Sequence, residues 1–180
     1  MTWSFTLIKL LTVKAESDVG REVLDNLNAK LFVEFWPRLE KCLTLCSEEQ
    51  LWFRFNESTN SIGNLVLHLE GNLRQWIIHG VGGAEDVRNR KKEFATSGGF
   101  SKEELKQRLE VLKAELQEVW KDIPEESLSN KRHIQGFETS VLGALIHGVE
   151  HYSYHLGQVS MIVKMLRNID LKYYENHNLD

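Results

Sequence analysis

The chain has 180 residues, of which 42% are hydrophobic and 27% are charged, with a formal net charge of −4. This length predicts a single domain over residues 1–180. The composition is ordinary for a globular protein, and it lacks the basic excess of a nucleic-acid-binding protein. Two cysteines exclude a disulfide-rich secreted scaffold and indicate a reducing compartment, so we expect a cytoplasmic protein.

The first 17 residues include an apolar run, MTWSFTLIKLLTV, over residues 1–13. The run has no basic start and no small-residue cleavage site after it, so it does not fit a signal peptide. It is shorter than the roughly 20 residues that a membrane-spanning helix needs, and no other stretch is long and apolar enough. We therefore expect no membrane association and interpret residues 1–17 as an N-terminal extension, either a packed arm or the product of an upstream start codon.

Helical periodicity begins near residue 18. Over residues 18–46, apolar side chains recur at four-residue spacing, which predicts a helix rather than a strand. Pro37 lies inside this stretch and is expected to kink or break the helix. A second helix is predicted over residues 61–79, because Gly80 and two further glycines follow it as a stop signal.

Two more helices are predicted in the second half of the chain. Residues 80–100 are polar and rich in glycine, and we expect a long loop there. Ser101 and Glu104 match a capping box, so a third helix is expected over residues 101–123. A fourth is expected over residues 139–168, after another loop. Four long helices with one apolar stripe each predict an all-α fold, a four-helix bundle, and the loop lengths leave the helix order open.

Three of the seven histidines lie on one face of the fourth predicted helix. His147, His151 and His155 recur every four residues and fall within about 80° of arc. This face is also apolar, and three imidazoles on a core face are costly unless they have partners. A structural cluster held by hydrogen bonds is one interpretation. A metal site accounts better for the whole stripe.

Metal ligation requires ring nitrogens about 2.0–2.1 Å from the ion. Residues four apart on a helix point the same way, so His151 and His155 can chelate one ion. The third ligand must come from another helix, and His68 on the second predicted helix is the best candidate. His147, one turn away, could be a fourth ligand, a partner of a ligand or a base. Three imidazoles with an open fourth position suit catalytic zinc, nickel, copper or iron.

A rival motif overlaps this stripe. Residues 147–151 read H-x-x-E-H, the inverzincin peptidase signature, in which two histidines bind zinc and the glutamate acts as the base. On a regular helix, however, Glu150 projects about 100° away from His151. The chain also offers no obvious downstream carboxylate ligand. We therefore expect Glu150 to make a surface or interhelical polar contact.

The same residues carry a family resemblance. HGVEHYSYHLGQ, residues 147–158, resembles the signature of the DinB-like (YfiT-type) metalloprotein superfamily, H-x-x-x-H followed by x-G-Q. NSIGNLVLHLEGN, residues 60–72, resembles the second helix of that family with its single ligand histidine. The resemblance covers roughly residues 21–172. It implies a four-helix bundle in up-down-down-up order, and usually a homodimer.

The resemblance also implies a site and a chemistry. The implied ligands of a divalent metal ion, zinc or nickel, are His68, His151 and His155. Some members of the superfamily are thiol S-transferases or isomerases that use a low-molecular-weight thiol, and others are described as metal-dependent hydrolases. We therefore predict a metal-dependent thiol S-transferase acting on a small molecule, in which His147 or Gln158 helps to orient the thiol or its proton acceptor. A metal-dependent hydrolase and a non-enzymatic dimeric metal-binding protein are the alternatives.

Other residues receive simpler interpretations. Leu67 and Ile78 are expected to project from the back of the second helix, where exposed apolar side chains fit a dimer interface. Cys42 and Cys46, four residues apart, are expected to be core residues rather than a redox pair or a metal site. The basic run over residues 88–92 is expected to be solvated, with anion binding as the alternative.

Overall fold

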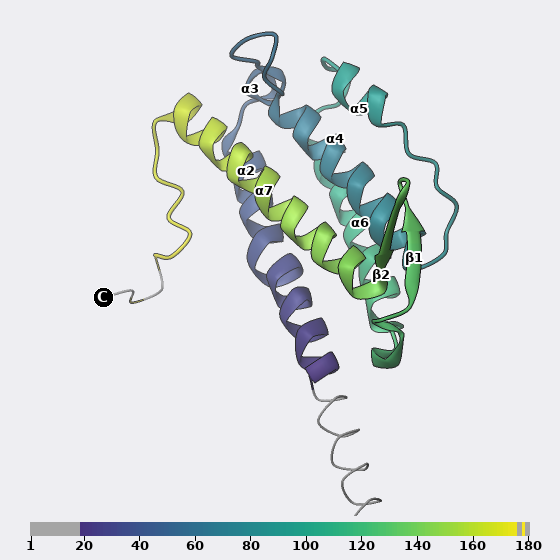
Figure 1. Cartoon of the computed structure of the whole chain (residues 1–180). Coiled ribbons are helices and arrows are strands. Elements are labelled where there is room, and N and C mark those ends of the chain that lie inside the picture. Colours follow the sequence, from purple (N-terminus) through teal and green to yellow (C-terminus); the bar gives the residue numbers. More distant parts are fainter. Residues whose placement is uncertain (1–18, 176–177, 179–180) are drawn as a thin grey trace, which may run out of the picture.

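The computed structural model describes residues 19–175 and 178. The predicted extension, residues 1–17, and His177 therefore lie outside the described residues. Four long helical segments lie side by side, and a small hairpin packs at one end of them (Figure 1).

The first segment is one continuous helix. Residues 19–28 are α-helical and lead into the π-helical η1 (Ala29–Phe35) and then α2 (Trp36–Leu45). Pro37 lies in the first turn of α2. Proline has no N–H and crowds the carbonyl four residues earlier, and the wider π turn before it accommodates both effects without a break. The predicted helix over residues 18–46 is therefore confirmed, with a π segment in place of a break.

The second segment follows the short α3 (Glu48–Trp52) and is made of α4 (Ile62–Leu73) and the π-helical η2 (Arg74–His79). Ser61 begins it, because its hydroxyl accepts from the backbone N–H of Asn64 while the Asn64 side chain accepts from the backbone of Ser61. Such reciprocal bonds satisfy donors that a helix start leaves free. The prediction over residues 61–79 is confirmed.

The third and fourth long segments are α6 (Lys102–Lys121) and α7 (Val141–Arg167). The predicted capping box of Ser101 and Glu104 is present at the start of α6. A single 3-10 turn, η3 (Glu125–Ser127), follows α6.

Both predicted loops contain regular structure. Residues 80–100 include the helix α5 (Arg90–Ala95), and residues 131–140 form an antiparallel hairpin of β1 (Lys131–Ile134) and β2 (Phe137–Ser140). The hairpin turns at Gln135 and Gly136, whose φ angles of 54° and 84° suit a tight two-residue turn. The all-α prediction therefore holds for the main body, to which a two-stranded sheet is added. The strands are mostly exposed, so they show no apolar alternation in the sequence.

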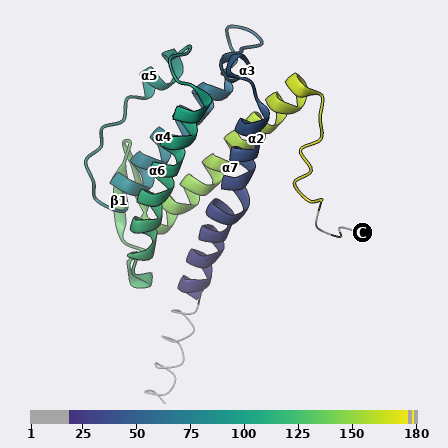
Figure 2. The same ribbon diagram turned by 180° about the vertical axis from the view of Figure 1, so that it is seen from behind.

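The order of contacting residues gives the direction of each helix. Glu70 of α4 pairs with Arg108 of α6, and Arg74, the first residue of η2, pairs with Glu115 of α6. The chain order is the same, so the second segment and α6 run parallel. Along α4, successive residues contact earlier and earlier residues of α7, so these two helices are antiparallel. Along the first segment, successive residues contact later and later residues of α7, so these two run parallel. These contacts are His68–His151, Asn72–His147, Trp36–Tyr152 and Cys42–Ser160. The bundle is therefore up-down-down-up, as the two opposite views show (Figures 1 and 2).

The core lies between the four long segments and is built largely from leucine. Its fully buried members include Leu39, Leu43, Leu65, Leu69, Leu112, Leu116, Tyr152 and Val159. Cys42 and Cys46 are free and buried in this core, as expected. None of the described helices combines the length and the apolar character needed to cross a bilayer.

Candidate metal centre

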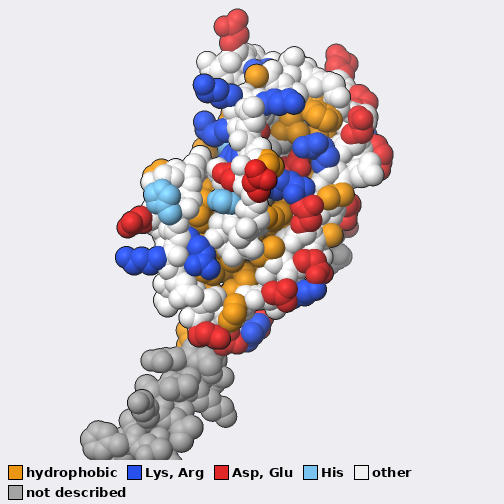
Figure 3. Space-filling view, turned by 90° about the vertical axis from the view of Figure 1, so that its right-hand side faces the viewer, with side chains coloured by type: hydrophobic (Ala, Val, Ile, Leu, Met, Phe, Trp, Pro, Cys, Tyr) orange, Lys and Arg blue, Asp and Glu red, His pale blue; other side chains and the backbone are white. Residues whose placement is uncertain are grey.

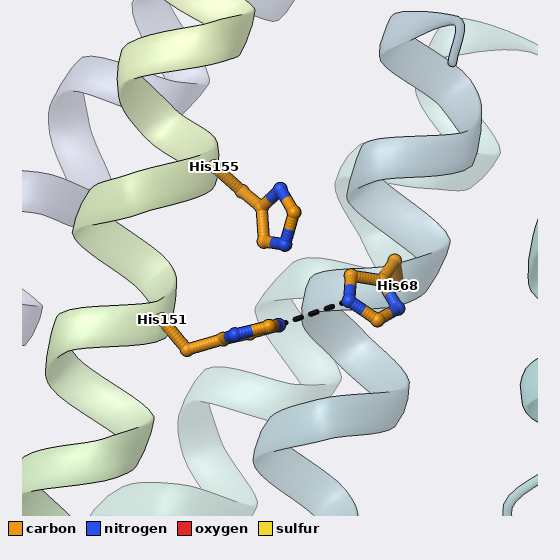
Figure 4. Close-up of side chains that lie close together, drawn as sticks. All are labelled: His68, His151 and His155. Atoms are coloured by element: carbon orange, nitrogen blue, oxygen red, sulfur yellow. Dashed lines mark hydrogen bonds between the residues drawn. The ribbon is translucent and has the colours of Figure 1, made fainter. Parts of the chain in front are cut away.

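Three histidines converge between two antiparallel helices. His68 projects from α4, and His151 and His155 project from successive turns of α7 into the same space (Figure 4). One ring nitrogen of each lies within 4.8 Å of the others, and the Nε2 atoms of His68 and His151 are 2.9 Å apart. The structure thus brings together the three residues predicted as ligands.

Hydrogen bonds fix the orientation of two of these rings. His68 Nδ1 lies 2.8 Å from Glu93 Oε2, and His155 Nδ1 lies 2.8 Å from Gln158 Oε1. A carboxylate or amide oxygen can only accept, so each Nδ1 carries a proton, and in the neutral ring the lone pair of Nε2 then faces the shared space. Metal-binding histidines typically donate their second ring N–H in this way.

The cluster is also electrically suited to a cation. Burial and the neighbouring histidines lower the pKa of His151 to about 3. Burial likewise lowers the pKa of His155. Both rings are therefore neutral at neutral pH, which is the protonation state that metal binding requires. Three imidazoles at one point, two of them neutral, make a donor set that fits a divalent metal ion.

Glu93 connects the cluster to the segment that was predicted to be a loop. Arg88 donates from Nε to Glu93 Oε1 at 2.8 Å and from Nη2 to Oε2 at 3.0 Å. The side chains of Arg88 and Glu93 are only 4% and 8% exposed. Burial acts to raise the pKa of Glu93, but the hydrogen bonds and charges of His68 and Arg88 lower it overall. Glu93 is therefore an ionised carboxylate held between two basic groups.

The predicted solvation of the basic run is wrong for one residue. Arg88 turns inward to Glu93 because the segment around it folds back on α4, whereas Lys91 and Lys92 are exposed as expected. Asn64 anchors this segment, since its Nδ2 donates to the backbone oxygens of Glu93 at 2.9 Å and Thr96 at 2.6 Å.

A comparison of sequences gives the family of this chain. Residues 18–175 match the family described as "Protein of unknown function (DUF1572)". The chain belongs to the DUF1572 family. No curated protein is significantly similar to it in sequence.

A solved structure shares the fold of this DUF1572 protein. It is the crystal structure of a DinB-like protein from Bacillus cereus ATCC 10987, which is 14% identical in sequence and superposes with a TM-score of 0.62. The match covers 75% of this chain and 87% of that one. The resemblance to DinB-like proteins predicted from the sequence is therefore confirmed at the level of the fold.

His147 lies beside the cluster but does not point into it. Its Nε2 is 3.2 Å from Asn72 Nδ2, and its ring stacks on Trp76 with 3.7 Å between the centroids. Burial lowers the pKa of His147, so this ring is neutral as well. Glu150 is exposed, as expected, and the group of three possible ligands among the described residues contains His151 but neither His147 nor Glu150.

Aromatic rings form two walls of the cluster. Phe94 lies 4.6 Å from His68 between ring centroids, and Tyr154 lies 5.0 Å from His155. Tyr154 is 65% exposed, so its side of the cluster faces solvent.

Leu67 and Ile78 were predicted to be exposed on the back of the second helix, and this prediction is wrong. Leu67 is 7% exposed and Ile78 is half-buried, because the segment of residues 84–100 folds over this side of α4. The homodimer itself stays a prediction.

Two residues of the site were missed from the sequence. Glu93 lies in a stretch without apolar periodicity, so the sequence predicted neither a helix at this position nor a contact between Glu93 and His68. Asn64 offered a signal, because a polar amide on an otherwise apolar helix needs a partner when it is buried.

Proposed function

We propose that this DUF1572 protein holds one divalent metal ion with His68, His151 and His155 and transfers a low-molecular-weight thiol to a small electrophilic substrate. The observation that carries the proposal is the convergence of three imidazoles, two of which have their Nδ1 protons held by Glu93 and Gln158. Three protein ligands leave a coordination position for a substrate, as in catalytic rather than structural sites. The fold of the DinB-like protein is consistent with this proposal.

Zinc or nickel bound there would supply a positive charge that stabilises a thiolate, the reactive form of a thiol. The remaining chemistry belongs to the residues around the cluster. In the transfer, the thiol sulfur forms a bond to an electrophilic carbon, and the leaving group departs with the electrons of the broken bond. His147 is a neutral imidazole one turn from His151 whose Nε2 accepts from Asn72 Nδ2, so it can take the thiol proton once that hydrogen bond is released. Gln158 acts through His155, whose ring it orients.

The carboxylate beside the cluster is not free to act as the base of a hydrolase. Hydrolases commonly use a carboxylate as general base, and the carboxylate that contacts the cluster among the described residues is Glu93. Both of its oxygens are taken, one by Arg88 and the other by Arg88 and His68. His147 is the candidate base that thiol transfer and hydrolysis share. Hydrolysis remains the alternative that the assay below separates.

The metal content of the purified, untagged protein tests the first part of the proposal. We expect about one equivalent of zinc, nickel or another divalent ion per chain, lost in His68→Ala and in His155→Ala. His133→Ala is the matched control, because His133 is exposed on β1 and outside the cluster. A wild-type protein that holds no metal after reconstitution would contradict the proposed site.

A thiol panel tests the second part. The metal-loaded protein is mixed with monochlorobimane and, in turn, cysteine, glutathione or bacillithiol, and the fluorescent adduct is followed. We expect turnover only when a thiol is supplied, and its loss in His155→Ala. Turnover of ester substrates without thiol would favour the hydrolase. Stoichiometric metal with neither activity would favour a non-enzymatic metal-binding protein.

A further inference from the structure

A row of exposed side chains runs along α7 on the side away from the core. Its members, here called the α7 row, are Glu150, Tyr154, Gly157, Met161 and Lys164. At about 100° per residue, all five fall within about 80° of arc on the helix surface. Figure 1 shows α7 across the front of the bundle, and Figure 2, from the opposite side, shows α2 and α6 in front of it. The row is therefore open to another molecule.

The spacing of the α7 row is that of a seam between two helices. Its members follow one another at steps of four, three, four and three residues, which is the seven-residue repeat of paired helices. Tyr154 and Met161 occupy its middle and are 65% and 59% exposed. Single exposed apolar side chains are ordinary on a protein surface, but two at seam positions on either side of Gly157 give a partner helix a surface to pack against.

The two ends of the row carry opposite charges. Glu150 stands seven residues before Gly157, and Lys164 stands seven residues after it. Both side chains are exposed, and neither forms an ion pair with a described residue. Gly157 is thus the midpoint of a row whose charges become complementary when the row is reversed.

This reversal indicates a second copy of the same helix as the occupant. In an antiparallel pair of α7 helices centred on Gly157, Glu150 faces Lys164 of the partner subunit, and the same contact occurs twice. In a parallel pair, like charges would face each other at both ends, which is unfavourable. The antiparallel pair has two-fold symmetry and is closed, so it forms a dimer and not a filament. Paired helices lie about 8–10 Å apart, so Gly157 leaves room for a methyl group at the centre.

The row reaches the candidate metal centre at Tyr154. The Tyr154 ring lies 5.0 Å from the His155 ring between centroids and forms the wall of the cluster that faces solvent. In the antiparallel pair, Tyr154 lies against Met161 of the partner subunit. A second copy would therefore cover this wall, which one chain alone leaves open.

The face on the other side of α4 lacks such a row. Residues 84–100 pass over it, and Figure 3 shows hydrophobic side chains there between interspersed acidic and basic ones. Arg74 and Arg108 on that face are already paired with Glu70 and Glu115. These arginines are satisfied within the chain, whereas Glu150 and Lys164 have no such partners among the described residues.

We propose that two copies of this chain pair through the α7 row, antiparallel about Gly157, with Glu150 of each copy facing Lys164 of the partner subunit. The partner copy then completes the solvent-facing wall of the histidine cluster at Tyr154. The pairing rests on an outer face of α7 and not on the proposed reaction, so it stands whether or not the cluster holds a metal ion.

Sedimentation equilibrium of the full chain, without added metal, tests the proposal at protein concentrations from about 1 to 300 µM. We expect a monomer–dimer equilibrium. Glu150→Lys and Lys164→Glu should each weaken the dimer about tenfold, because each removes two symmetry-related ion pairs and opposes like charges. The double variant Glu150→Lys/Lys164→Glu restores both pairs and should bind within about threefold of the wild type. A chain that is monomeric throughout, single variants that dimerise as the wild type does, or a double variant no tighter than the single ones would overturn the proposal.

Glu57→Lys is the matched control for Glu150→Lys. Glu57 is exposed on the loop before α4, so the variant makes the same change of charge away from the α7 row. It should leave the dissociation constant of the dimer unchanged. An equal weakening by Glu57→Lys would show that net charge, and not the row, governs the pairing.

Nitration by tetranitromethane, read by peptide mass spectrometry, tests the cover over Tyr154. At concentrations where the dimer dominates, we expect Tyr154 to react about fivefold or more slowly than in the dilute monomer, since only the monomer exposes it. Tyr174, which is 49% exposed and lies outside the α7 row, is the internal reference and should react equally in both. Equal rates for Tyr154 at both concentrations would contradict its place beneath the partner copy.

Discussion

Two glutamates of this protein each bridge two basic side chains, in very different surroundings. Glu34 lies on the first helical segment, where its Oε2 is 2.5 Å from Lys30 Nζ and its Oε1 is 3.0 Å from Arg38 Nη1. All three residues are four apart on one face of the helix. The side chains of Lys30, Glu34 and Arg38 are 56%, 28% and 17% exposed, so water reaches this group whether or not the ion pairs form.

Glu93 bridges His68 and Arg88, which come from α4 and from the segment before α5. Here the side chains of His68, Glu93 and Arg88 are 5%, 8% and 4% exposed. The distances resemble those at Glu34, but burial changes how much each ion pair contributes to the free energy of unfolding. Exposed pairs contribute about 0–1 kcal/mol, whereas removing one partner of a buried pair costs about 3–5 kcal/mol because a charge stays buried without compensation. Distances alone therefore do not rank these two groups.

The largest effect should follow the loss of Arg88. Arg88→Met keeps an unbranched side chain but removes the guanidinium, which leaves Glu93 buried with only His68 as a basic partner. We expect the free energy of unfolding of the metal-free protein to fall by about 3–5 kcal/mol, measured by urea denaturation and tryptophan fluorescence. Typical domains are stable by about 5–15 kcal/mol, so the variant should still be measurable.

Arg90→Met is the control for Arg88→Met. Arg90 lies two residues away, is exposed, and contacts the Phe94 ring at 5.0 Å. We expect a loss of no more than about 1 kcal/mol. Similar losses of stability in the two variants would mean that the burial of Arg88 does not increase its contribution to the free energy of unfolding.

Removing the charge of Glu93 should act on the metal centre. Glu93→Gln keeps an oxygen near His68 Nδ1 but takes away the negative charge that raises the basicity of the ring. We expect metal affinity, measured by competition with a chelator, to fall about 10- to 100-fold. Glu85→Gln, on the same segment but with an exposed side chain, should leave affinity unchanged. An unchanged affinity in Glu93→Gln would show that Glu93 serves packing alone.

The two glutamates also show what the sequence could reveal. Spacing of four residues on a helix is visible in a sequence, and the same logic predicted the four long helices and placed His151 beside His155. His68 was predicted from its position on a second helix and from a family resemblance. Glu93 was missed because its contact with His68 depends on a segment returning across α4, and no periodicity marks a six-residue helix or a mostly exposed hairpin. Contacts made by such returning segments are set by tertiary structure.

A smaller effect should follow from the close approach of Glu93 to α4. A Cβ added at Gly71 would lie 2.1 Å from Glu93 Oε1 and 3.1 Å from Arg88 Nε. Alanine is the better helix former by about 1 kcal/mol, but overpacking typically costs about 1–3 kcal/mol. We therefore expect Gly71→Ala to lose about 1 kcal/mol in urea denaturation.

Gly157→Ala gives the matched comparison on α7. Among the described residues, a Cβ at Gly157 would meet no atom beyond its own turn of helix within 4 Å, so only helix propensity should act. We expect a gain of up to about 1 kcal/mol. A gain of the same size in Gly71→Ala would show that Glu93 can move aside freely.

The smallest effect should come from Glu34→Gln, which removes the charge of the exposed group. We expect a loss below about 1 kcal/mol in low salt, because i,i+4 pairs on a helix surface contribute a few tenths each. At 1 M NaCl the screening length falls to about 3 Å, and the loss should nearly disappear. The loss in Arg88→Met should persist under the same salt, because buried charges are screened far less. If salt removed both losses equally, water would have to reach Glu93 as freely as Glu34, and the contrast between the two groups would fail.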